Sequence, residues 1–161
     1  MPWCLTPGRG RLLLVLALVL PGLAAAHGAR AGDVLIDHPY ATPSEPGART
    51  AAVYFRALKN TGATADRLLG AHTAAARAVQ IQRASAETGQ TRLRAMPLLE
   101  VPAGATLSLR HGGDTQLTLV DLSAPLKDGD RFLLTLRFER GEREVSVWVQ
   151  RPRGRSPPHP P

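Results

Sequence analysis

The sequence predicts an all-β protein with a single domain, a Greek-key β-sandwich. Three stretches near the C-terminal end carry this prediction, because their apolar side chains recur at every second position, as in a strand that buries one face. They are residues 116–120, 132–138 and 145–149. Turn residues separate them at 125–130 (PLKDGD) and 140–142 (RGE), where glycine allows positive φ. We expect three consecutive antiparallel strands.

The same alternation between turn signals recurs along the rest of the chain, after a short polar lead at 28–32. We expect strands at 33–38, 51–58, 67–71, 79–82, 91–94, 99–101 and 107–109, and a helical turn at 74–76. The turn signals are prolines and glycines, for example Asn60-Thr61-Gly62. Eight or nine short strands at this spacing, with no long amphipathic helix, favour a Greek-key sandwich.

The period of two also predicts which side chains face the core. In 51–58 it places Val53, Phe55 and Ala57 on one face, with Leu58 on the other. In 79–82 it turns the two apolar residues inward and both glutamines outward.

The first 26 residues have the pattern of a secretory signal peptide. Two arginines precede an apolar run at 12–20, and Ala24-Ala25-Ala26 supplies a small-residue cleavage site before His27. The apolar run ends at Pro21, too short to cross ~30 Å of hydrocarbon. We therefore expect a periplasmic protein whose mature chain has no membrane span. Cys4 lies within the signal, so the mature domain has no thiol.

The predicted organisation is a signal peptide at 1–26, one sandwich domain at 27–150 and a disordered tail at 151–161. The tail is rich in proline and arginine, so it can neither pair in a sheet nor bury apolar area. A partner-binding role for the tail is the alternative. We expect the domain to be a monomer.

Two classes of function are disfavoured by the sequence. No serine lies in a nucleophile-elbow setting and no glycine-rich phosphate loop joins a strand to a helix, so we expect no enzyme. The formal net charge of +7 raises nucleic acid as a ligand, but aromatic residues make up only 4% of the chain and offer few stacking platforms. We expect no nucleic-acid partner.

Several short motifs together resemble the PCu(A)C family of periplasmic copper chaperones. They are DHPYATP at 37–43, TAAVYF at 50–55, NTG at 60–62, DRLLGA at 66–71, VPAG at 101–104 and PLKDGD at 125–130. The resemblance runs in register over about 32–149, nearly the whole domain. It implies a cupredoxin-like β-sandwich that binds Cu(I) at one end through histidine and methionine. Its implied partners are exported copper proteins or oxidase assembly factors.

This chain departs from the family at the copper ligands. Laid on the family's frame, the four ligand positions fall on Gln82, Leu93, Gln116 and Thr118. A carboxamide or hydroxyl is a hard, weak donor and leucine has no lone pair, whereas Cu(I) favours soft thioethers with imidazole. We do not expect these four residues to bind Cu(I).

Other residues are candidates for a relocated copper site: His27, His38, Met96 and His111. The amine of a mature N-terminus and the His27 ring could also chelate Cu(II). Each has a simpler interpretation, because His111 next to glycine is typical of a solvated turn, Met96 of a core filler and His38 before proline of a structural position. His72 and His159 are expected to be exposed and unpaired.

Two functions follow. The first is an exported copper-chaperone-like protein that binds Cu(I) and hands it on by ligand exchange. The alternative is a metal-free binding or assembly module on the same sandwich, which uses its basic surface to dock acidic partners.

Overall fold

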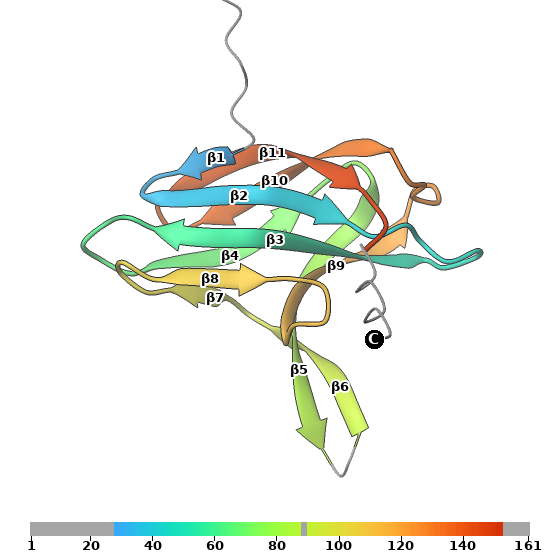
Figure 1. The fold of residues 1–161 in the computed structure, drawn as a ribbon, viewed down its shortest axis with the longest axis horizontal. Coiled ribbons are helices and arrows are strands. Elements are labelled where there is room, and N and C mark those ends of the chain that lie inside the picture. The colour runs from blue at the N-terminus through green and yellow to red at the C-terminus, as the bar shows by residue number, and fades with distance from the viewer. Residues whose placement is uncertain (1–27, 88–89, 153–161) are drawn as a thin grey trace, which may run out of the picture.

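The computed structural model describes residues 28–87 and 90–152, and this part of the chain is built from β-strands and turns (Figure 1). No helix within these ranges is long and apolar enough to cross a bilayer. The strands are β1 (Gly28–Ala31), β2 (Val34–Ala41), β3 (Thr50–Asn60), β4 (Asp66–His72), β5 (Ala76–Glu87), β6 (Gln90–Met96), β7 (Leu99–Val101), β8 (Thr106–Leu109), β9 (Thr115–Leu122), β10 (Arg131–Phe138) and β11 (Gly141–Val149).

The strands form one hydrogen-bonded path that divides into two layers. Its order is β6-β5-β9-β3-β2-β11-β10-β4-β7, with β1 added to β2 and β8 to β3. Every pairing is antiparallel except that of β2 with β11, which joins only Trp148 to Tyr40 and Val149 to Ala41. We call these two parallel pairs the β2–β11 seam.

One apolar core fills the space between the layers. Phe55 and Leu117 enter it from one layer, and Leu68, Leu134 and Val147 from the other. All five are fully buried. The predicted all-β sandwich is therefore confirmed.

Strands β2 and β3 each change neighbour part-way along their length. β2 pairs with β1 through Asp37 and with β11 from Tyr40, and between them His38 has a φ of 46°. His38 is also skipped in the β2–β3 register, where Asp37 faces Ala57 and Pro39 faces Phe55. β3 likewise pairs first with β9 and then with β8. The regular ladder of the sheet is therefore interrupted where β2 and β3 change neighbours.

The irregularity in β3 corrects one predicted face. Its register with β8 shifts between Phe55 and Leu58, and both side chains are fully buried. Because the extra residue reverses the alternation, Leu58 lies on the core side and Ala57 does not share the face of Phe55.

Three other local predictions are corrected by hydrogen bonding. β9 does not form a hairpin with β10, because it pairs with β5 and β3 while β10 pairs with β11 and β4. The predicted helical turn is a non-helical turn at 74–75, and Ala76 already begins β5. The polar lead at 28–32 contains β1, which pairs with β2.

Asn60 fixes the corner that follows β3. Its buried amide donates to the backbone oxygens of Thr64 and Val101 and its side-chain oxygen accepts from the N–H of Gly62. A Cβ on Gly62 would lie 2.5 Å from Asp33, which explains the glycine of the NTG motif.

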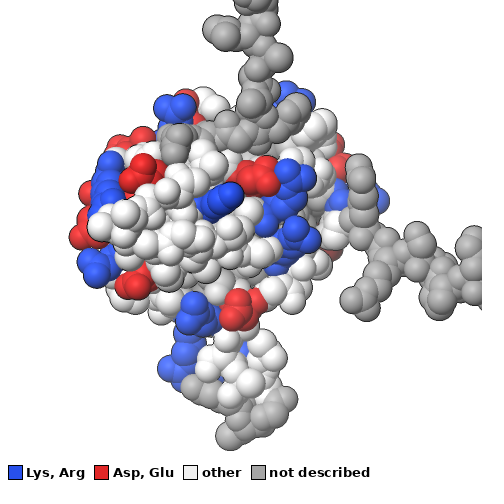
Figure 2. Space-filling view, turned by 60° about the vertical axis from the view of Figure 1, so that its left-hand side comes forward, with Lys and Arg blue, Asp and Glu red and all other residues white. Residues whose placement is uncertain are grey.

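The β5–β6 hairpin extends beyond the body of the sandwich (Figure 1). Arg83 lies opposite Arg94, and Arg92 lies opposite Ser85, so the three arginines share one face of the hairpin. Figure 2 shows basic side chains gathered there, whereas both signs are scattered over the rest of that view. Charge on the edge strand β6 opposes pairing with another sheet edge.

Candidate functional site

Three of the four positions that the resemblance assigns to the family's ligands meet on the outer face of β5 and β9, where Gln82 and Gln116 are paired in register. The Thr118 hydroxyl donates to Gln82 Oε1 at 2.7 Å and accepts from Gln116 Nε2 at 3.1 Å. Gln82 Nε2 donates to Gln80 Oε1 at 3.0 Å. We call these four residues, Gln80, Gln82, Gln116 and Thr118, the polar network.

The fourth family position, Leu93, lies on the same face as the polar network. It pairs with Ala84, and Gln82 pairs with Ala95, so Leu93 is the diagonal neighbour of Gln82 across the β5–β6 hairpin. Its side chain is 49% exposed. Leucine therefore occupies the place where a fourth ligand would be needed.

The polar network does not fit Cu(I). Its amides and hydroxyl are hard metal ligands. These side chains are also already hydrogen-bonded to one another. A soft monovalent ion would have to break these hydrogen bonds and receive no thioether or imidazole in return.

Tyr54 connects the polar network to a neighbouring groove. Its hydroxyl donates to Gln116 Oε1 at 3.4 Å, and its ring packs 5.3 Å from that of Tyr40 and edge-on to His111 at 5.4 Å. Burial, and after it the neighbouring Tyr40, raise the pKa of Tyr54 above its ordinary value of 10.0. The raised pKa favours the neutral phenol, which is the form that donates the hydrogen bond to Gln116.

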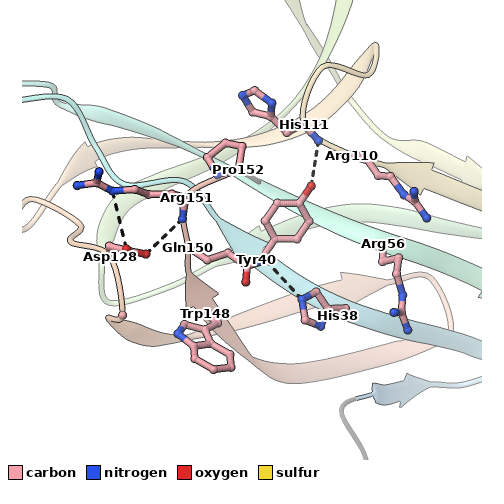
Figure 3. A pocket seen from close by; sticks show the side chains of 11 residues that line it. His38, Tyr40, Arg56, Arg110, His111, Asp128, Trp148, Gln150, Arg151 and Pro152 are labelled. Carbon is pink, nitrogen blue, oxygen red and sulfur yellow. Dashed lines mark hydrogen bonds and ion pairs between the residues drawn. The ribbon is translucent and has the colours of Figure 1, made fainter. Parts of the chain in front are cut away.

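The groove is an open cavity of about 920 Å³ at the place where β2 and β3 change neighbours. Figure 3 shows Tyr40 at its centre, with His38 and His111 on opposite sides of the ring. We call it the aromatic groove; its lining includes His38, Tyr40, Arg110, His111, Trp148 and Gln150.

The irregular backbone at His38 and the loop after β8 shape the two ends of the aromatic groove. His38 Nε2, in β2, lies 3.4 Å from Nε2 of Gln150, the residue that follows β11. The backbone N–H of His111 donates to the Tyr40 hydroxyl at 3.0 Å and so holds the β8–β9 loop over the groove (Figure 3).

The structure separates the candidate substitute ligands. His111 lies beside Tyr54 at the network's end of the aromatic groove, whereas His38 lies beyond Tyr40. Met96 pairs with the buried Ile81 and packs against the core, on the face of the hairpin opposite Gln82. His27 lies outside the described residues.

Histidine and carboxylate side chains do not cluster elsewhere in the described chain. Within residues 28–87 and 90–152, no group of three or more His, Cys, Asp or Glu side chains is placed to hold a metal ion. His72 is exposed at the end of β4, while His159 lies in the part not described.

Sequence reasoning missed the aromatic residues of the groove. In β11 the buried valines alternate with exposed residues, so Trp148 stands on the outer face and is 41% exposed. A large aromatic at a solvent-facing strand position was the available signal. The His38-Pro39 pair within a strand was a second one, because proline in a sheet marks an edge or a bulge.

Comparisons with known proteins match most of the described chain. A family model described as "Putative lipoprotein LpqE-like" matches residues 34–149. A relative described as a putative lipoprotein, from Leifsonia xyli subsp. xyli (strain CTCB07), is 34% identical over 126 residues, which cover 78% of this chain and 74% of the relative.

Solved structures of copper-binding domains have the same fold. The copper-bound PCuAC domain from PmoF2 is 25% identical, with a TM-score of 0.67 over 79% of this chain and 100% of that domain. The Cu(I) form of DR1885 from Deinococcus radiodurans is 26% identical, with a TM-score of 0.59 over 80% of this chain and 83% of that one. The resemblance expected from the motifs is confirmed.

Proposed function

Because the chain belongs to the LpqE-like family, we propose that it is an exported member of the copper-chaperone fold that acts by reversible binding rather than catalysis. In this proposal it serves as a docking or assembly module and carries no Cu(I) at the family's ligand position. Exported copper proteins and oxidase assembly factors are the partners that the fold suggests.

The observation that carries this proposal is the closed polar network. Thr118, Gln82 and Gln116 hydrogen-bond to one another at the positions that the motif resemblance assigns to the family's soft ligands. Replacing all four ligands removes the soft donor set that Cu(I) prefers, while the aromatic groove beside the network offers a surface for a partner.

Export rests on two separate observations. The pattern of the first 26 residues is that of a signal peptide, and the matched family and relative are described as lipoproteins. Cys4, the single cysteine, precedes the predicted cleavage site. We therefore propose release into the periplasm without a lipid anchor at that cysteine.

A Cu(I) competition titration against a chromogenic chelator tests the proposal, using protein purified after export and its His111→Ala and Met96→Leu variants. The expected result is no withdrawal of Cu(I) from the chelator by any of the three. Stoichiometric Cu(I) binding by the parent chain would reject a metal-free module.

A displaced copper site is the second candidate function. It is favoured by one observation, that His38 and His111 both line the aromatic groove. In that case the parent chain would bind copper and the His111→Ala variant would lose it. Met96 packs against the core, so the Met96→Leu variant would still bind.

A further inference from the structure

The charges of the aromatic groove are unbalanced. Arg56, Arg110 and Arg151 line it, against a single carboxylate, that of Asp128. In the close-up, Arg56 and Arg110 lie on one side of Tyr40, and Arg151 and Asp128 on the other (Figure 3). An arginine therefore lies on each flank of an aromatic floor, and the excess of positive charge lies on the flank of Arg56 and Arg110.

The three arginines differ in whether their guanidinium groups already form ion pairs or hydrogen bonds within the protein. Arg56 forms two hydrogen bonds to Asp37, at 2.7 and 3.0 Å. Arg151 lies 3.8 Å from Asp128, with 81% of its side chain exposed, so this pair is weak. Within the described residues the Arg110 guanidinium has neither an ion pair nor a hydrogen bond. Arg110 is thus the groove's available cation.

The aromatic groups supply an apolar surface next to that charge. Trp148 is 41% exposed, and Arg131 stacks over its ring at 4.5 Å from the centroid. Tyr40 and His111 continue the aromatic surface toward the polar network. An open cavity of about 920 Å³ with exposed walls suits an extended chain that runs along it.

We propose that the aromatic groove binds an acidic, extended segment of a partner protein, with carboxylates paired to Arg110 and Arg151 and the segment lying against Tyr40 and Trp148. Charge complementarity selects this occupant. The chain's own tail after Pro152 carries arginines and no carboxylate side chain, so it does not match the groove's charge. The inference names the partner class for the docking role above and therefore rests on that role.

A titration with fluorescein-labelled hexaglutamate, followed by anisotropy, tests this binding on protein purified after export. Hexaglutamine of the same length is the uncharged control. We expect binding of hexaglutamate only, weakened by raising the salt to about 0.5 M because the guanidinium groups are exposed. Fluorescence of Trp148, excited in parallel with unlabelled peptide, should change over the same concentration range.

Two matched variants locate the site. Arg110→Gln should weaken hexaglutamate binding by about fivefold, as loss of one exposed ion pair predicts. Arg143→Gln, which removes an exposed arginine at the other end of β11, should leave the affinity unchanged. Equal weakening by both variants would indicate general attraction to a basic protein and would overturn the proposal. So would the absence of an anisotropy change, or equal binding of the two peptides.

The two proposals fail in distinguishable ways. The copper titration reports on the polar network and the peptide titration on the aromatic groove. A chain that binds neither Cu(I) nor hexaglutamate would retain the metal-free assignment and lose only the acidic partner.

Discussion

Thr118 Oγ1 lies 2.7 Å from Gln82 Oε1, a contact that joins β9 to β5 at two of the positions that the motif resemblance assigns to the family's ligands. Three side chains from different family positions thereby complete one another's hydrogen bonds. The polar groups of these side chains are thus taken up by hydrogen bonds to one another. Substituting the side chains would remove these hydrogen bonds.

Restoring the family's ligands should create a Cu(I) site. The combined variant Gln82→His, Leu93→Met, Gln116→His and Thr118→Met places two imidazoles and two thioethers on one face of three neighbouring strands. We expect it to withdraw one Cu(I) per chain from a chromogenic chelator that the parent leaves loaded.

The double variant Gln82→His, Gln116→His serves as its control, because it lacks the thioethers and should bind Cu(I) more weakly. If the fourfold variant folds and gains no affinity, the assigned family positions are wrong.

The buried and exposed leucines of β10 should differ sharply in their contribution to stability. Leu134 is fully buried and Leu133 is 55% exposed. Leu134→Ala should lower the free energy of unfolding by about 2–5 kcal/mol, through lost burial and the cavity left behind. Leu133→Ala should change it by within about 0.5 kcal/mol. Urea denaturation of both variants measures the difference, and similar losses would contradict the core described above.

Tyr54 should make stability depend on pH in alkaline solution. Its pKa is raised by burial and then by Tyr40, so above pH 10.0 the unfolded chain releases a proton that the folded chain retains. The free energy of unfolding should therefore fall as the pH rises through this range, and this contribution should be fully present below it. Urea titrations at increasing pH measure the slope.

Two phenylalanine variants separate the causes. Tyr54→Phe should remove this part of the slope. Tyr40→Phe should retain most of it, because burial is the larger cause. An unchanged slope in the Tyr54 variant would show that other groups produce the alkaline loss.

The left-handed backbone at His38 should reverse the usual order of alanine and glycine in a strand. With φ at 46°, a Cβ is unfavourable by about 1–2 kcal/mol, whereas glycine in a regular strand is destabilising by roughly 0.5–1 kcal/mol. His38→Gly should thus be more stable than His38→Ala. At Ser146, exposed in β11, the glycine variant should be the less stable one. Thermal unfolding of the four variants decides this; the same order at both sites would argue against the left-handed backbone at His38.

The alternation of apolar and polar side chains predicted much of the fold. The predictions that failed depended on how strands far apart in the sequence pair. The alternating valines of β11 and the turn glycine at 129, with φ of 92°, follow from side-chain period and backbone freedom. The partner of β9 did not follow, because a period of two gives a strand's buried face and not its neighbour. Leu58 was misplaced because a bulge reverses the phase without any change of composition.

The candidate site was predictable only in part. The family's frame located Gln82, Gln116 and Thr118, which do lie together. Their mutual hydrogen bonds depend on side-chain orientation, and the aromatic groove depends on bringing Tyr40 next to Trp148, residues far apart in the chain. No local pattern encodes that parallel contact.

Because the aromatic groove lies at the β2–β11 seam, a molecule bound there would affect how firmly the two layers are held together. Two residue pairs are the only ladder between β2 and β11, and the groove is lined from both sides of it, by His38 and Tyr40 of β2 and by Trp148 of β11. A molecule lying there would touch both layers and act as a staple across the narrowest hydrogen-bonded connection of the sandwich. Binding of such a molecule would slow amide exchange at the end of β11 and would increase the resistance of the two layers to separation.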